Sequence, residues 1–90
     1  MPLIRCELNS IQSMAQLYDE LNRQLVLPKQ TGRNLDALWD VLSTDVEGPI
    51  EIVWPTAQQD RITLGKQGEA VFDLLNDLAD ERDDVTLKLG

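Results

Sequence analysis

The clearest indication of the fold is the sequence GPIEIVWP, at residues 48–55. Within it Ile50, Ile52 and Trp54 occupy every second position, which is the pattern of a strand with one buried face. Pro55 closes the strand because proline cannot donate a hydrogen bond to a neighbouring strand. Sequence with helical periodicity lies on both sides of this stretch. The stretch therefore predicts a strand that is connected to its neighbours through helices.

Two further strands are predicted near the ends of the chain. Ile4, Cys6 and Leu8 alternate with polar residues, and apolar residues alternate with Thr and Lys over residues 85–89. Helical crossovers between successive strands imply a parallel sheet. Because each strand alternates, only one face of that sheet is covered. We therefore predict a single α/β domain over residues 1–90, with two layers: a three-stranded parallel sheet covered on one face by three or four helices.

Apolar residues at helical spacing locate the first two helices. One spans about residues 13–26, with Ser13 and Gln16 in the positions of a capping box and Pro28 as its stop. The next begins at Asn34, a residue type that caps helices well. Four apolar residues then share one side of this second helix: Leu35, Leu38, Trp39 and Leu42.

The helical pattern after the central strand is less even. Residues 56–66 are ambiguous and allow a short helix that ends near Gly65. Residues 68–82 predict a helix more clearly, because four apolar residues form a stripe with acids away from it. The stripe consists of Val71, Leu74, Leu75 and Leu78.

The charge balance restricts the choice of partner. The chain has 16 acidic residues, 8 basic residues and no histidine among its 90 residues, which gives a formal net charge of −8. A surface of this sign repels phosphates, so nucleic acid and anionic membranes are poor candidates for direct contact. A basic protein or a cation is the natural counterpart, although an acidic surface also serves simply to keep a domain soluble.

Residues suited to catalysis or cofactor binding are scarce. Without histidine the chain lacks the commonest general base and the usual activator of a nucleophile. Cys6 lies inside a predicted strand and is interpreted as a structural thiol. The glycines are scattered, and no loop has oxygen ligands at alternate positions, so we predict no cofactor and no metal site. Paired carboxylates could hydrolyse a glycosidic bond, but so short a chain has few residues to line a cleft for an extended sugar. We therefore expect that the protein is not an enzyme.

The same features predict a cytoplasmic protein. A single cysteine allows no intramolecular disulfide, which fits a reducing compartment. The N-terminal apolar stretch is too short and too charged for a signal peptide. No apolar run approaches the roughly 20 residues that span a bilayer. A monomer is the simplest expectation for the oligomeric state.

Carboxylates recur at helical intervals on two of the predicted helices. Asp36 and Asp40 are four residues apart, hence about 40° apart around the helix axis. Like charges at such spacings cost roughly 0.2–0.5 kcal/mol per pair. The pattern indicates either a preformed binding surface or a solvated face, and spacing alone leaves both open. The last helix carries its acids on one face and at its end: Glu69, Asp73, Asp77, Asp80 and Glu81.

The string GRNLDALWDVL, at residues 32–42, closely resembles the centre of the barstar family of intracellular ribonuclease inhibitors. LVLP at residues 25–28, the strand at residues 49–54 and the tail DVTL at residues 84–87 are similar to the same family. The resemblance therefore covers nearly the whole chain. It implies a three-stranded parallel sheet packed against helices on one side, in agreement with the pattern above.

The resemblance also implies a partner, a barnase-like ribonuclease, and a set of contact residues. In the family, the helix matching residues 34–43 and the loop before it plug the ribonuclease active site. Asp40 matches the aspartate that enters the pocket for a substrate phosphate, facing the enzyme's arginines and histidine. Asp36 matches a second contacting carboxylate. The other matched positions are Asn34, Leu35 and Trp39 at or beside the contact surface, Ser43 in place of a threonine, and Asp77 and Glu81 as acids that add to the negative field.

The chain departs from the family at several positions. Gln30, Thr31 and Asp45 stand where a typical member has aromatic residues, and Arg33 stands where it has an acid. Aromatic residues are common interface anchors, so these changes lower the expected affinity for barnase itself. Two alternatives stay open: a cognate ribonuclease with a different rim, and an acidic adaptor that keeps the fold and binds another basic protein.

Overall fold

The computed structural model describes residues 3–25 and 34–90, apart from the side chain of residue 45. The predictions for Pro28, Gln30, Thr31 and Arg33 lie outside the described residues. All three predicted strands are present, and the ambiguous segment contains a helix that ends next to Gly65. In chain order the elements are β1 (Ile4–Glu7), α1 (Met14–Leu25), α2 (Leu35–Asp40), the π-helical turn η1 (Val41–Asp45), β2 (Ile50–Trp54), α3 (Ala57–Leu64), α4 (Lys66–Glu81) and β3 (Val85–Leu89).

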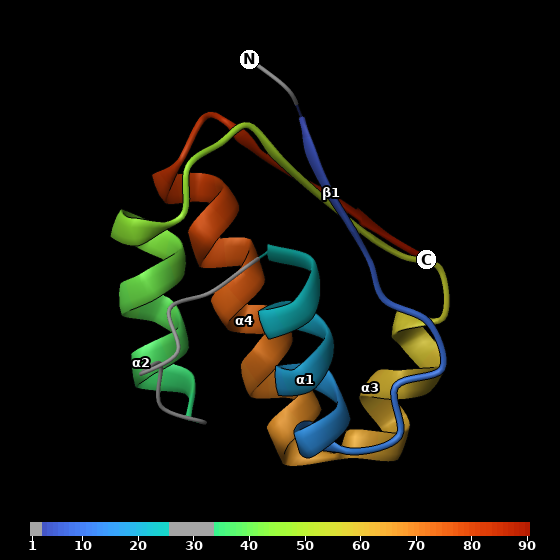
Figure 1. Ribbon diagram of the computed structural model, residues 1–90. Helices are drawn as coiled ribbons and strands as arrows, with labels where there is room; N and C mark the ends of the chain where they lie inside the picture. Colours follow the sequence, from blue (N-terminus) through green and yellow to red (C-terminus); the bar gives the residue numbers. More distant parts are fainter. Residues whose placement is uncertain (1–2, 26–33) are drawn as a thin grey trace.

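The sheet has the parallel topology that the alternation predicts. Its strand order is β1-β2-β3, and both neighbouring pairs are parallel. Ile52 lies opposite Cys6 of β1 and Leu87 of β3, so the alternating apolar side chains share one face. The helices lie on one side of the sheet (Figure 1). The two-layer α/β architecture expected from the sequence is therefore confirmed.

The face of the sheet that the helices cover forms one side of the hydrophobic core. Cys6, Ile52 and Trp54 are fully buried there. The Trp54 ring meets that of Phe72 in a tilted contact with a centroid distance of 5.2 Å, which joins β2 to α4. Burial raises the pKa of the Cys6 thiol to about 12, so the thiol stays protonated at neutral pH. This environment confirms the interpretation of Cys6 as a structural residue.

The other face of the sheet carries charges of both signs. Glu51 Oε1 lies 3.7 Å from Arg5 Nε of β1 and 3.6 Å from Lys88 Nζ of β3. Surface pairs whose basic member is exposed, as here, contribute at most about 1 kcal/mol each to stability. They also balance the charge of this face, so the excess acid of the chain has to lie elsewhere.

The start of α1 differs in one detail from the predicted capping box. Ser13 Oγ accepts a hydrogen bond from the backbone N–H of Gln16 at 3.1 Å, as expected. Gln16 Oε1 accepts from the backbone N–H of Gln12 at 3.0 Å, whereas the standard capping box uses the N–H of the N-cap residue itself. The Gln16 amide also donates to the Ser10 carbonyl at 3.2 Å. The side chain of Gln16 therefore anchors the loop before the helix.

Two glycines shape the tight turn between α3 and α4. Gly65 has a φ of +67°, in the left-handed region that favours glycine, and it ends α3. Consequently α4 begins directly after it at Lys66, two residues before the predicted start at residue 68. A Cβ atom on Gly68 would lie 2.8 Å from the carbonyl oxygen of Arg61, so the close approach of the two helices requires glycine there.

One carboxylate is buried where β2 leads into α3. Asp60 is only 3% exposed. Its Oδ2 accepts hydrogen bonds from the backbone N–H of Ile11 at 2.9 Å, from Trp54 Nε1 at 2.7 Å and from Thr56 Oγ1 at 2.6 Å. This single side chain therefore joins α3 to the end of β2 and to the loop before α1.

Candidate functional site

The candidate site begins at the N-terminus of α2. Asn34 adopts an extended backbone conformation, and its Oδ1 accepts a hydrogen bond from the backbone N–H of Ala37 at 2.8 Å. The predicted N-cap is thus confirmed. Asn34 is exposed, and its Oδ1 is committed to the helix. Asp36 lies in the first turn, where the positive end of the helix dipole favours a carboxylate.

Apolar packing sets the rotation of α2 about its axis. Leu38 is buried, while Leu35 and Trp39 are half-buried and pack against the core. This arrangement leaves Asp36 and Asp40 exposed on α2. Trp39 therefore contributes both to the core and to the surface, as the sequence predicts.

The helical segment changes its winding after Asp40. Val46 donates from its backbone N–H to the carbonyl of Val41 at 3.1 Å, a spacing of five residues that defines the π-helical turn η1. The helix predicted from Asn34 is therefore present through Leu42, but its hydrogen bonding changes from α to π after Asp40. The hydroxyls of Ser43 and Thr44 both donate to the carbonyl oxygen of Asp40, at 3.3 and 2.6 Å. The half-buried Ser43 thus donates to the backbone of Asp40 itself, the principal predicted site residue.

A groove separates α2 from α4. It has a volume of about 290 Å³. Exposed carboxylates of both helices lie beside half-buried or buried apolar side chains, so the groove combines an apolar surface with negative charge. The described residues that line it are Leu35, Asp36, Trp39, Ala70, Asp73, Leu74 and Asp77.

The predicted site residues do not all lie in this groove. Asp40 is exposed one helical turn beyond Asp36, and Glu81 is exposed one turn beyond Asp77 on α4. Among residues 3–25 and 34–90, no ion pair involves Asp36, Asp40, Asp77 or Glu81. Their charges are therefore not neutralised by a described cation of the same chain. The groove brings Leu35, Asp36, Trp39 and Asp77 together. The other predicted residues, Asn34, Asp40, Ser43 and Glu81, are not among its lining residues.

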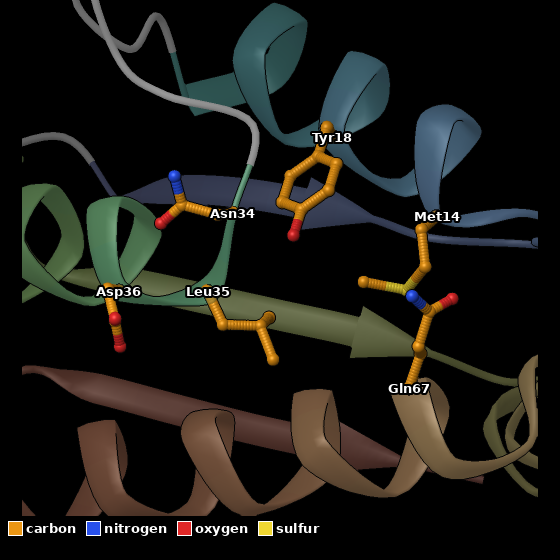
Figure 2. A pocket seen from close by; sticks show the side chains of 6 residues that line it. All are labelled: Met14, Tyr18, Asn34, Leu35, Asp36 and Gln67. Atoms are coloured by element: carbon orange, nitrogen blue, oxygen red, sulfur yellow. The ribbon is translucent and has the colours of Figure 1, made fainter.

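A second hollow adjoins the groove at the N-terminus of α2. Figure 2 shows Met14 and Tyr18 extending from α1 towards Leu35 and towards Gln67 of α4. The hollow has a volume of about 470 Å³. Leu35 and Asp36 line both this hollow and the groove, which places the Asp36 carboxylate between two recesses of the surface.

Sequence reasoning missed a basic residue at the C-terminal end of the site. The Arg82 side chain is only 14% exposed. Its Nη1 donates to the carbonyl oxygens of Leu42 and Val46, both at 2.7 Å. Its Nε and Nη2 donate to the two carboxylate oxygens of Asp84 at 2.9 and 2.8 Å, and these hydrogen bonds hold the pKa of Asp84 below its usual value. The only sequence signal was that Arg82 is the single base between Glu69 and Asp84.

The described residues offer neither a metal site nor a membrane span. Within residues 3–25 and 34–90, no group of three or more His, Cys, Asp or Glu side chains is arranged to hold a metal ion. No helix in those ranges combines the length and the apolar character needed to cross a membrane. The arrangement as a whole presents negative charge and an apolar groove to another molecule.

Comparison with known proteins gives consistent matches. The family model described as Barstar (barnase inhibitor) matches residues 1–90. A protein of Bacillus subtilis (strain 168), named "Putative ribonuclease inhibitor YrdF", is 32% identical over 73 residues, which cover 81% of this chain and 80% of that protein. The family match includes all three strands and both helices that border the groove.

Proposed function

Because the chain belongs to the barstar family, we propose that it inhibits a barnase-like, basic microbial ribonuclease by covering its active site. The family is described as inhibitors, so the chain is a binding protein and not an enzyme. The resemblance carried by residues 32–42 is confirmed by this membership. The identity of the contact residues remains our proposal.

The observation that carries the proposal is the position of Asp40. Its side chain is exposed at the end of a capped helix, and it forms no ion pair with a described residue. A ribonuclease lines its active site with positive charge in order to bind phosphates. A fixed carboxylate can occupy the place of such a phosphate and accept charge-assisted hydrogen bonds from arginine. We assign Asp40 this role.

The remaining contact residues extend the surface around Asp40. Asn34, Leu35 and Trp39 provide contacts from α2, and Ser43 provides a hydroxyl from η1. Asp36 and Asp77 supply carboxylates beside the groove, and Glu81 adds a charge at the end of α4. Surrounding acids of this kind raise the rate of encounter with a basic protein through long-range attraction.

The proposal includes the setting in which the protein acts. The partner is the ribonuclease itself, and direct contact with nucleic acid or membrane is not part of the mechanism. The protein acts as a monomer in the cytoplasm, where it protects the cell's RNA from the enzyme. No cofactor or metal takes part.

A ribonuclease panel tests the proposed function. The protein should abolish RNA cleavage by at least one small basic ribonuclease at low salt. Its association rate with that enzyme should fall about tenfold or more between 50 and 500 mM salt, because salt screens the attraction between exposed charges. A stopped-flow binding measurement at both salt concentrations provides this number.

The alternative function is an acidic adaptor, which Gln30, Thr31 and Asp45 favour because they replace aromatic anchors. A pull-down from the host cell separates the two functions. Recovery of a basic protein that is not a nuclease, together with no inhibition across the ribonuclease panel, would support the adaptor and reject the inhibitor.

A further inference from the structure

Arg82 lies where the C-terminal ends of the two acidic helices meet. The last carbonyl groups of a helical segment have no donor within the segment and carry its negative partial charge. Arg82 Nη1 donates to two such carbonyls around η1, those of Leu42 and Val46. Arg82 itself directly follows Glu81, the last residue of α4. One guanidinium therefore connects the end of η1 to the end of α4.

The other side of the guanidinium is fixed equally well. Asp84 accepts two parallel hydrogen bonds from Nε and Nη2, a geometry that restricts rotation of the planar group. Gly48 packs directly against this pair, since a Cβ atom there would overlap the Asp84 carboxylate and lie 3.0 Å from Arg82 Nη2. The guanidinium is thus held between η1, the start of β3 and the segment before β2.

We propose that Arg82 is a positioning residue for ribonuclease binding. By holding η1 against the end of α4, it sets the position of Asp40 and Ser43 relative to Asp77 and Glu81. A surface that is already arranged for its partner binds more tightly than one that has to be ordered on binding. The inference rests on the proposed function for its effect on affinity, and on the hydrogen bonds alone for its effect on η1.

The first test needs no partner. Arg82→Met keeps the apolar stem of the side chain and removes all its donors. The backbone amide of Val46, which closes η1, should exchange its hydrogen at least about tenfold faster in this variant. The amide of Leu38, near the capped start of α2, is the control. Its exchange rate should change only as much as the change in global stability explains. An unchanged rate at Val46 would overturn the inference whether or not the protein inhibits a ribonuclease.

The second test is a double-mutant cycle with a ribonuclease that the parent inhibits. Arg82→Met should weaken binding about tenfold in the parent and less than about threefold in an Asp40→Ala background, because its effect acts through Asp40. With Asp36→Ala, at the other end of α2, the two losses should multiply. Losses that multiply with Asp40→Ala as well would show that Arg82 does not position Asp40.

Two further variants separate positioning from general stability. Asp60 lies in α3, which follows the C-terminal end of β2, whereas Arg82 precedes the start of the parallel strand β3. Asp60→Asn therefore weakens the fold at the opposite end of the sheet, and it should change the ribonuclease Kd less than about threefold. If Asp60→Asn lost as much affinity as Arg82→Met, Arg82 would affect binding only through the general stability of the fold. Arg82→Lys keeps the charge but cannot reproduce the planar fork, so it should show the same coupling with a smaller loss and replaces the Met variant if that does not fold.

Discussion

Replacing Asp40 with alanine should weaken binding to the target ribonuclease by about thirtyfold to several thousandfold. Truncating one member of a buried, hydrogen-bonded charge pair costs roughly 2–5 kcal/mol, a range for which barnase–barstar is itself a reference case. The loss should appear mainly as faster dissociation, since the contact is short-ranged. Because Asp40 is exposed in the free protein, its free energy of unfolding should change by less than about 0.5 kcal/mol.

Glu69→Ala is the matched control for Asp40→Ala. Glu69 is an exposed acid in the first turn of α4, so its removal changes the net charge by the same amount. The control should lower the association rate slightly and the affinity less than about threefold. Isothermal titration of both variants against the same enzyme gives the comparison. Equal losses in the two variants, or full inhibition by Asp40→Ala, would remove Asp40 from its assigned role.

Replacing Asp60 with alanine should have the largest effect on stability. The variant leaves the Ile11 N–H, the Trp54 indole N–H and the Thr56 hydroxyl without their acceptor in a buried environment. Such unsatisfied groups make a loss of about 3 kcal/mol in the free energy of unfolding the expected result. Urea denaturation at pH 7, with the exposed Asp83→Ala as control, measures it. An unchanged unfolding midpoint in Asp60→Ala would show that the three hydrogen bonds contribute nothing to stability.

The pH dependence of stability tests the contribution of Asp60 independently. Burial opposes ionisation of Asp60, but its three hydrogen bonds together outweigh burial and hold its pKa below the usual value. A carboxyl whose pKa is lower in the folded state stabilises the fold above the unfolded-state pKa of about 3.9, and that stability is lost as pH falls through the folded-state pKa. Asp60→Asn should therefore show a smaller loss of stability than the parent between pH 5 and pH 3.

The fold could be predicted to a large extent because its determinants are local. Alternation at Ile50, Ile52 and Trp54 fixed the central strand, and helical segments on both sides implied parallel neighbours. The cap at Asn34 was also predictable, since it depends on residues only three positions apart. The start of α4 was misplaced because the apolar stripe begins at Val71, whereas the left-handed turn at Gly65 sets the boundary.

Features that depend on distant partners could not be predicted. The turn η1 receives hydrogen bonds from Arg82, which is 40 residues away from Leu42 in the sequence. Asp60 belongs to a segment with an ambiguous pattern, and its partner Ile11 is 49 residues away. In both cases the sequence shows a charged residue in a helix or at its end, which is normally exposed. Only the tertiary packing shows that these side chains are largely buried.

The candidate site was partly predictable for the same reason. The spacing of Asp36 and Asp40 placed both on one side of a helix, and both are exposed on α2. The groove next to them depends on how α2 packs against α4, so the proximity of Asp36 to Asp73 and Asp77 emerged only from the structure. Contact between these residues and a ribonuclease remains a prediction.

A crystal structure of the protein bound to an inhibited ribonuclease would show what Asp40 contacts in the complex. We predict that the Asp40 carboxylate lies within about 3 Å of arginine nitrogens in the pocket where the enzyme holds a substrate phosphate. A complex in which Asp40 faces solvent, or contacts the enzyme away from any cationic side chain, would contradict the account.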